Sequence, residues 1–429
     1  MAPSSPSVAA RLERLVSLAG RPPGGAWFVP GRLEVLGKHT DYAGGRSLVC
    51  AVERGFVLAA APRDDGEVVL LDAVSGERAA TRLDPALEPP ERHWARYPAV
   101  VARRLARNFP DARRGADIVF ESDLPAAAGL ASSSAFMIAF FLALAEVNAL
   151  ARSETWGRLL ATREDLAGYL AAVENGAAFG SLAGDSGVGT RGGSEDHTAI
   201  LCSEAGRLKQ YAYGPVRHER TIALAPHLVF VIAASGVIAE KTGAAREAYN
   251  RASALAARLL EIWCAGTGST ASSLAEALSS DPDAADWLRR AVRRLAAPGE
   301  AAALLDRLDH FVEESLILVP AAAGRLAAGD LAGFGELADR SQALAERLLR
   351  NQVPETVALA RLARSAGAPA ASAFGAGFGG SVWALVAAED AAAFVERWSA
   401  AYRHACPRAA ERAAFFVTRP GAAAGAIDL

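Results

Sequence analysis

Residues 30–48 read PGRLEVLGKHTDYAGGRSL, an alternation of apolar and charged residues followed by a polar turn. The alternation predicts a strand that ends near Gly37. Such a turn has no apolar face to bury, so its charges belong either to a solvated hairpin tip or to a polar pocket. Hydrogen-bonding groups of limited flexibility favour the pocket over a solvating fringe. Five ionisable residues of the segment lie within ten positions, namely Arg32, Glu34, Lys38, His39 and Asp41.

This segment resembles the signature of galactokinases, PGR-x-N-LIGEHTDY-x-GG, a branch of the GHMP kinases. Two positions depart from that signature: Glu34 stands where the family has Asn, and Lys38 stands where it has Glu. The resemblance implies that His39 and Asp41 contact a sugar. It also implies that Arg32 flanks the catalytic aspartate and keeps it ionised.

The length and composition are those of an ordinary globular enzyme. A chain of 429 residues exceeds what one core usually supports, which predicts two lobes. Hydrophobic residues make up 52% and charged residues 22% of the chain. The net charge of −3 gives no electrostatic basis for binding nucleic acid or an acidic membrane.

Several features predict a cytoplasmic protein. Cys50, Cys202, Cys264 and Cys406 are scattered, without a pair spaced for zinc or redox chemistry. The N-terminal residues lack the apolar core of a signal peptide. The most apolar run, residues 135–145, is too short to span a bilayer and predicts a buried helix.

A glycine- and serine-rich loop lies between a predicted strand at 116–122 and this apolar helix. Residues 124–135 read LPAAAGLASSSA. Backbone N–H groups and the positive end of a helix dipole would converge there on a phosphate. The serines could instead serve only as a helix N-cap, but three in a row exceed what capping needs. The loop lacks the lysine of a P-loop.

This loop is similar to the second GHMP motif, P-x-x-x-GL-x-SS-[AS], with Ala131 in place of the usual Gly or Ser. The resemblance implies that ATP is the co-substrate and that Ser133 is a Mg²⁺ ligand. The residues expected to bind ATP are Ala128, Gly129, Leu130, Ala131, Ser132, Ser133 and Ser134.

Residues 192–197 read GGSEDH and resemble the CGIMDQ segment of galactokinases. That likeness places Asp196 at the catalytic aspartate and Gly193 at a sugar-contacting position. Glu174 looks like the helix glutamate that completes the Mg²⁺ shell, although a solvated helix end is the alternative. Tyr249 matches a further sugar-contacting position, within an expected helix at 240–251.

Residues 374–381 read FGAGFGGS and resemble the third family motif, TGAGFGGC. The three motifs occur in family order over nearly the whole chain. The resemblance implies an α+β, two-lobed GHMP kinase fold with the active site in the cleft between the lobes. The N-terminal mixed α/β lobe, residues 1–220, would carry a nucleotide loop of the left-handed-crossover type. The C-terminal α+β lobe would comprise residues 221–429.

The function implied is ATP-dependent phosphorylation of the anomeric (C1) hydroxyl of a galactose-like sugar by a monomeric enzyme. A non-catalytic sugar sensor is disfavoured because the loop serines and Asp196 are retained. A kinase for a non-sugar alcohol such as homoserine or mevalonate is disfavoured because those branches lack the HTDY-x-GG turn.

Lys38 bears on the identity of the sugar. The family glutamate at this position accepts hydrogen bonds from hydroxyls near C6, whereas a lysine has three donors and no acceptor. An acidic sugar, such as a uronic acid, is therefore one hypothesis. The other is that Lys38 pairs with Glu34 and a neutral sugar still binds.

Overall fold

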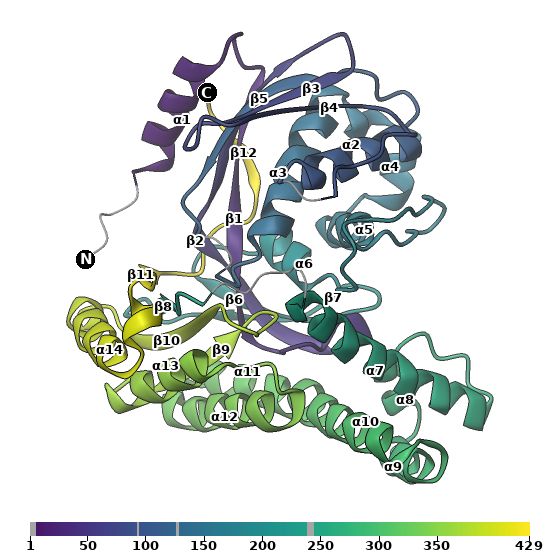
Figure 1. Cartoon of the computed structure of the whole chain (residues 1–429), viewed down its shortest axis with the longest axis vertical. Helices are drawn as coiled ribbons and strands as arrows, with labels where there is room; N and C mark the ends of the chain where they lie inside the picture. The colour runs from purple at the N-terminus through teal and green to yellow at the C-terminus, as the bar shows by residue number, and fades with distance from the viewer. Residues whose placement is uncertain (1–5, 92–93, 126–127, 238–243) are drawn as a thin grey trace.

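The computed structural model describes residues 6–91, 94–125, 128–237 and 244–429. Within these residues the strands form two sheets (Figure 1). The larger has the order β12-β1-β2-β5-β3-β4, with β6 paired to β2 and β7 paired to β6. The smaller has the order β11-β8-β10-β9 and is antiparallel throughout.

The strands of both sheets, in chain order, are β1 (Gly25–Leu36), β2 (Arg46–Pro62), β3 (Glu67–Asp72), β4 (Arg78–Arg82), β5 (Ala116–Ser122), β6 (Arg207–Ala212), β7 (Arg217–Ala223), β8 (Leu228–Ala234), β9 (Ala370–Phe374), β10 (Ser381–Ala387), β11 (Ala414–Thr418) and β12 (Gly425–Ile427). The strand expected at 116–122 is confirmed to the residue. Apolar patterns in the sequence also predict strands at 228–234 and 414–418, which are confirmed to the residue, and short strands at 27–29, 33–36, 47–52 and 55–60, which merge into the long pair β1 and β2.

The helices of the N-terminal half are α1 (Val8–Leu18), η1 (Asp41–Ala43), α2 (Arg96–Asn108), α3 (Ser132–Val147), η2 (Leu150–Arg152), α4 (Glu154–Leu159), α5 (Arg163–Asn175) and α6 (Glu195–Cys202). Those that follow are α7 (Ala244–Thr267), α8 (Leu274–Ser280), α9 (Ala284–Leu295), α10 (Pro298–Phe311), η3 (Val312–Leu318), α11 (Val319–Ala327), α12 (Leu331–Leu344), η4 (Ala345–Leu349), α13 (Pro354–Ser365), α14 (Ala391–Ala405) and α15 (Pro407–Ala410). The expected helix start at residues 240–243 lies outside the described residues.

The irregular pairing of β1 with β2 places charged residues of β1 at the pocket. The pairing of β1 with β2 shifts register between Pro30 and Arg32 and again between Glu34 and Leu36. Pro30 has no N–H to donate and therefore suits an irregular position in a ladder. These bulges place Arg32 and Glu34 on the pocket side of a strand whose other residues, such as Val35, are fully buried.

The apolar helix α3 forms the centre of the N-terminal core. Its side chains are buried around nearly the whole circumference, including Phe136, Ile138, Phe140 and Phe141. Helices α2, α3 and α5 lie on one face of the large sheet, and α1 lies on the other (Figure 1). Burying this much apolar surface anchors the N-terminus of α3, and with it the serine-rich loop.

A shared core joins the two sheets. Leu33 and Val35 of β1 pack in one cluster with Phe230, Phe334 and Trp383 of the C-terminal half. The indole N–H of Trp383 donates to the carbonyl oxygen of Val35 at 3.1 Å. The strand that carries the charged turn is thereby held from both sides, so the two halves form one continuous wall around the pocket.

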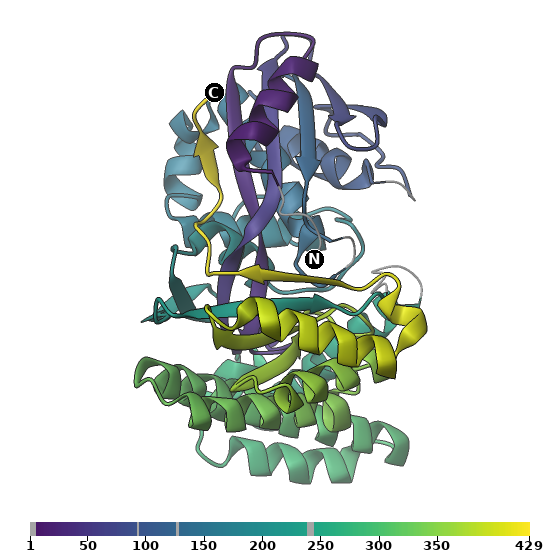
Figure 2. The ribbon, with the colours of Figure 1, turned by 90° about the vertical axis from the view of Figure 1, so that its left-hand side faces the viewer.

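The chain crosses between the sheets more than once. Residue 220 lies inside β7, and the change of sheet comes between β7 and β8. After β11 the chain returns to the large sheet, where β12 pairs with β1 (Figure 2). The division at 220/221 remains a prediction, and by sheet membership the last residues group with the N-terminal half.

In the described part of the chain, helices that combine enough length and apolar character to cross a bilayer are not found. All four cysteines are free thiols, and Cys50 and Cys202 are buried.

Candidate active site

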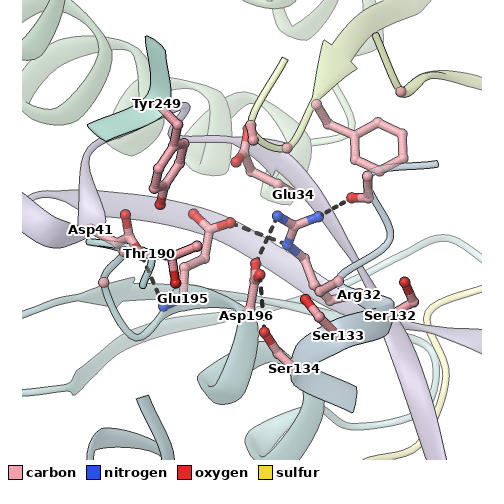
Figure 3. A pocket seen from close by; sticks show the side chains of 18 of the residues that line it. Arg32, Glu34, Asp41, Ser132, Ser133, Ser134, Thr190, Glu195, Asp196 and Tyr249 are labelled. Carbon is pink, nitrogen blue, oxygen red and sulfur yellow. Dashed lines mark hydrogen bonds and ion pairs between the residues drawn. The ribbon is translucent and has the colours of Figure 1, made fainter. Parts of the chain in front are cut away.

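One pocket gathers residues from all three glycine-containing motifs. It is lined by the end of β1, the turn after it, the loop before α3, the start of α6, Tyr249 of α7 and the loop between β9 and β10. Figure 3 shows Asp41 and Tyr249 to one side of Arg32 and the three serines to the other. The pocket therefore has two halves, with Arg32 between them.

Arg32 and Asp196 form the ion pair at the junction of these halves. Their side chains approach to 2.7 Å, between Nη2 and Oδ1. The Nε of Arg32 lies 3.4 Å from Oε1 of Glu195, and Nη1 donates to the carbonyl oxygen of Gly129 (Figure 3). Arg32 is 5% exposed. The planar guanidinium of Arg32 thus fixes Asp196, Glu195 and the loop that contains Gly129 relative to one another.

The charge of Arg32 is secure in this setting. Burial by itself would lower the pKa of Arg32, but the negative charges of Asp196 and Glu195, followed by those of Glu34 and Asp41, raise it above its ordinary value. A guanidinium does not release its proton in proteins. Arg32 therefore acts as a fixed cation and not as a proton donor.

The loop before α3 has the backbone geometry of an anion site. Gly129 and Ala131 both adopt left-handed conformations, with φ values of 73° and 57°. The chain then enters α3 at Ser132, so the N-terminal end of the helix dipole and the first turn of the helix face the pocket. All the ATP-binding residues predicted from sequence lie at this position, and all but Ala128 and Leu130 line the pocket.

The three serines differ in their surroundings. Ser132 and Ser133 are partly exposed and line the pocket, whereas Ser134 is 1% exposed. The hydroxyl of Ser134 donates to Oε2 of Glu174 at 2.7 Å and lies 3.4 Å from Oδ2 of Asp196. Ser134 therefore ties the helix glutamate to the catalytic candidate.

Glu174 lies in the half of the pocket that contains the three serines, and its side chain is buried. Its Oε2 is 3.2 Å from Nε2 of His197. Carboxylates and hydroxyls are the donors that Mg²⁺ prefers, and this ion commonly takes one or two of them plus phosphate oxygens and water. The described residues contain no cluster of three or more His, Cys, Asp or Glu placed to hold a metal by themselves. The chemistry of Glu174, Ser133 and Ser134 fits an ion that arrives with a nucleotide.

His39 is held rigidly in the other half of the pocket. Its Nε2 lies 3.0 Å from the carbonyl oxygen of Ala376, which can only accept, so Nε2 carries the proton. Its Nδ1 therefore accepts from the hydroxyl of Tyr42, also at 3.0 Å. Burial lowers the pKa of His39 to about 4, which keeps the ring neutral. The ring also packs against Tyr249, with 5.0 Å between centroids.

Asp41 links the turn after β1 to α6, the helix that carries Glu195 and Asp196. Its Oδ2 accepts a hydrogen bond from the backbone N–H of Glu195 at 3.2 Å. Burial raises the pKa of Asp41 above its ordinary value. The carboxyl group caps the start of α6 and also faces the pocket.

Gly193 lies against Asp41 so closely that a side chain would not fit. A Cβ atom at this position would come within 2.3 Å of Asp41 Oδ2 and 2.6 Å of the Tyr42 backbone nitrogen. We expect Gly193→Ala to displace Asp41 and to lower kcat/KM about 10²-fold, because the groups around the substrate lose their alignment. Steady-state kinetics with ATP and sugar measures this. Gly157→Ala is the control, since a Cβ there meets nothing within 4 Å; equal kinetics for the two variants would contradict the expectation.

The structure corrects the expectation for Lys38. Its side chain is fully buried and is not part of the pocket lining. Its Nζ donates to Ser341 of α12 at 2.8 Å, and the Ser341 hydroxyl donates in turn to Oε1 of Glu314. Burying an ammonium without such partners would be costly. The Lys38 ammonium therefore donates to Ser341. It does not line the pocket, and it does not hydrogen-bond to Glu34.

Three further lining residues had no role assigned from the sequence. Glu34 lines the pocket, as the charge pattern of its segment favoured, but its one suggested partner was Lys38. Glu195 was read only as the neighbour of Asp196. Asn175 makes two hydrogen bonds of 2.8 Å with the backbone of Gly192. Its Nδ2 donates to the Gly192 carbonyl oxygen, and its Oδ1 accepts from the Gly192 N–H. The adjacency of Asn175 to Glu174 was the available signal.

The loop between β9 and β10 closes the pocket over the phosphate loop. Gly375 comes so near that an added Cβ would meet the carbonyl oxygen of Gly129 at 3.0 Å. The hydroxyl of Ser381 donates to the carbonyl oxygen of Ala128 at 2.6 Å. The third motif thus supports the second through backbone contacts.

Comparison with known protein families agrees with this arrangement. Residues 15–62 match the galactokinase galactose-binding signature, residues 96–188 the N-terminal domain of GHMP kinases, and residues 322–404 their C-terminal domain. Galactokinase from Chloroflexus aggregans is 30% identical over 388 residues, which is 89% of each chain. Galactokinase from Streptomyces coelicolor is 32% identical over 196 residues, 45% of each chain.

Solved structures share the fold. The crystal structure of galactokinase from Lactococcus lactis complexed with galactose superposes with a TM-score of 0.78 at 23% identity, covering 98% of this chain and 100% of that one. The mevalonate kinase of Methanococcus jannaschii superposes with a TM-score of 0.57 at 14% identity, covering 92% of this chain and 98% of that one.

Proposed function

The chain belongs to the galactokinase family of the GHMP kinases and is an ATP-dependent sugar kinase; on that premise we propose that it phosphorylates the anomeric hydroxyl of a galactose-like monosaccharide. The product is then a sugar 1-phosphate. The observation that carries this proposal is the Arg32–Asp196 pair, 2.7 Å apart, between the phosphate loop and the turn that holds His39 and Asp41.

The reaction needs an oriented hydroxyl and a group to receive its proton. Asp196 is 21% exposed at its side chain, so it can reach a substrate in the pocket while Arg32 holds one of its oxygens. The carboxylate orients the attacking hydroxyl and accepts the proton as the phosphoryl group is transferred. Arg32 holds Asp196 by the ion pair and, through its hydrogen bond to Gly129, keeps it beside the phosphate loop.

The rest of the pocket binds and positions. The backbone of residues 128–134 holds the triphosphate, and His39, Asp41, Gly193 and Tyr249 form the sugar side. Glu174 and Ser133 would hold Mg²⁺, which supplies charge neutralisation to the phosphoryl oxygens. His39 and Tyr42 support one another, so the sugar side is formed before substrate arrives.

The serines test the register of the phosphate loop. We expect Ser133→Ala to raise the Mg²⁺ concentration required for half-maximal rate and to raise the KM for ATP about tenfold, because a pocket-facing oxygen ligand is lost. Ser134→Ala is expected to change both less, since its hydroxyl is already committed to Glu174. Rates measured across a Mg²⁺ titration for the two variants decide this. Equal effects, or a larger effect of Ser134→Ala, would mean that the Mg²⁺ ligand has been assigned to the wrong serine.

The hypothesis of an acidic sugar loses its basis because the Lys38 ammonium lies outside the pocket. The pocket instead contains the carboxyls of Glu34, Asp41, Glu195 and Asp196, whose field repels a uronate. A galactose-like sugar without a carboxylate is therefore the better candidate.

The direct test is a panel of free hexoses, pentoses and uronic acids assayed for ADP release. Phosphorus and proton magnetic resonance of the product then identifies the phosphorylated carbon. Turnover of galactose or an epimer with phosphate on C1 supports the proposal. Phosphate on another carbon, or turnover confined to non-sugar alcohols, refutes it. The monomeric state and the cytoplasmic location remain predictions.

A further inference from the structure

Two carboxyl groups in the pocket have no role in the chemistry described above. Glu34 of β1 and Glu195 of α6 are each 3% exposed, and both line the pocket. Besides burial, the negative charge of Glu34 helps to raise the pKa of Glu195, so the two carboxyl groups are close neighbours. The pair therefore places two buried acids beside each other at the pocket.

The positive charges nearby do not balance this pair. Five of the described lining residues are acids, namely Glu34, Asp41, Glu174, Glu195 and Asp196, whereas Arg32 is the single lysine or arginine among them. Arg32 makes its shortest ionic contact with Asp196 and lies farther, at 3.4 Å, from Glu195. The Lys38 ammonium donates to Ser341, and its charge lowers the pKa of Glu34 by less than burial raises it. The sugar half of the pocket is left with an excess of acid.

One oxygen of the pair lacks a partner. Oε1 of Glu34 is buried and accepts no hydrogen bond from the described residues. A buried carboxyl oxygen in that state costs free energy, which a donor from a ligand would recover. Burial raises the pKa values of both Glu34 and Glu195, because it disfavours their charged forms, and a cation bound beside them would favour those forms.

We propose that Glu34 and Glu195 bind an ammonium group of the sugar, and that the preferred substrate is a monosaccharide with a free amine. The inference rests on the proposed sugar kinase activity and specifies the substrate class. An ammonium offers three donors and no acceptor, which suits Glu34 Oε1 and the pair beside it. Binding it places a positive charge beside the two acids, and charge-assisted hydrogen bonds of this kind are about twice as strong as neutral ones.

A neutral hydroxyl and a metal ion fit the pair less well. A hydroxyl supplies one donor and leaves the excess of acid unchanged. A metal ion would need several acidic or imidazole ligands converging on one point, and the described residues form no such group. A carboxylate would add to the repulsion.

The test compares kcat/KM at about pH 7, where a primary amine is largely protonated. The acceptors are galactose, galactosamine, and the galactose derivatives with an amine at C4 or C6, each also in its N-acetylated form. We expect at least one free amine to exceed galactose about tenfold, and acetylation to abolish that advantage. Thermal shift of the wild-type protein by the same sugars provides a readout that is independent of turnover.

Glu34→Gln and Glu195→Gln keep the shape of the side chains and remove the charge. We expect each to lower the ratio of amine to galactose efficiency about tenfold. Glu219→Gln is the matched control, because Glu219 is ion-paired with Arg46 at 2.8 Å and does not line the pocket.

The outcomes separate this inference from the proposed function. The ammonium site is overturned if galactose is phosphorylated at least as well as every free amine. It is also overturned if Glu34→Gln and Glu195→Gln leave the ratio of amine to galactose efficiency unchanged. Either result leaves the sugar kinase intact. Failure of every sugar in the panel, with and without an amine, overturns the proposed function and the inference with it.

Discussion

Asp196→Asn is expected to lower kcat by about 10²–10⁴-fold while the KM for ATP changes little. The amide keeps the shape of the carboxylate but has neither its charge nor its capacity to accept a proton at neutral pH. Its oxygen can still accept a hydrogen bond from Arg32, which approaches the native carboxylate to 2.7 Å, so the pocket should remain intact. The loss would therefore appear in the chemical step.

Single-turnover phosphoryl transfer and nucleotide binding, measured side by side, check this expectation. Asp64→Asn is the control, because the Asp64 side chain is 91% exposed and distant from the pocket lining. Near-native turnover of Asp196→Asn would remove Asp196 from the mechanism. A parallel loss of nucleotide binding would mean that Asp196 acts by holding the site together.

Arg32→Ala is expected to have a comparable effect on kcat and, in addition, to destabilise the fold. The guanidinium is almost fully buried and contacts Asp196, Glu195 and the backbone of Gly129. Removing one partner of a buried ion pair typically costs about 3–5 kcal/mol, because the remaining charge is left uncompensated. We therefore expect a lower Tm as well as slower turnover.

Two further variants separate the catalytic part of this effect from the structural part. Arg32→Lys retains a positive charge, so it should recover more of the stability than of the turnover, since a lysine cannot reproduce the fork between Asp196 and Gly129. The double variant Arg32→Ala, Asp196→Asn should lose less than the product of the two single losses if the residues act as one unit. Fully multiplicative losses would show that they act independently.

Local patterns in the chain were sufficient for much of the fold. The apolar run at 135–145 could only be a buried helix, and it forms the centre of α3. The strands at 116–122, 228–234 and 414–418 were predicted correctly, because each contains a short stretch of β-branched or aromatic residues. The strands β4, β6, β7 and β12 were missed: the first three carry polar or charged residues, and β12 is three residues long.

The position and backbone geometry of the loop before α3 also follow from local sequence. An anion site of the kind expected there depends on backbone N–H groups and small side chains, and both come from residues that are adjacent in sequence. The left-handed conformations at Gly129 and Ala131 are local properties of the same segment. The ion pair of Arg32 with Asp196 joins positions far apart in the chain, and only the resemblance to a known family placed them together.

Lys38 and Glu34 mark the limit of what sequence determines. Both are charged residues at the end of one strand, and no local rule says which of them faces a pocket. The direction is decided by partners contributed by distant segments: Ser341 and Glu314 provide the Lys38 ammonium with a polar niche, whereas Glu195 lies beside Glu34 at the pocket. A buried charge goes where hydrogen-bonding partners exist, because desolvation without them costs more than any local preference. The chain thus specified many of the elements and the loop before α3, and the contacts of α12 and η3 with the turn after β1 decided the charge of the pocket.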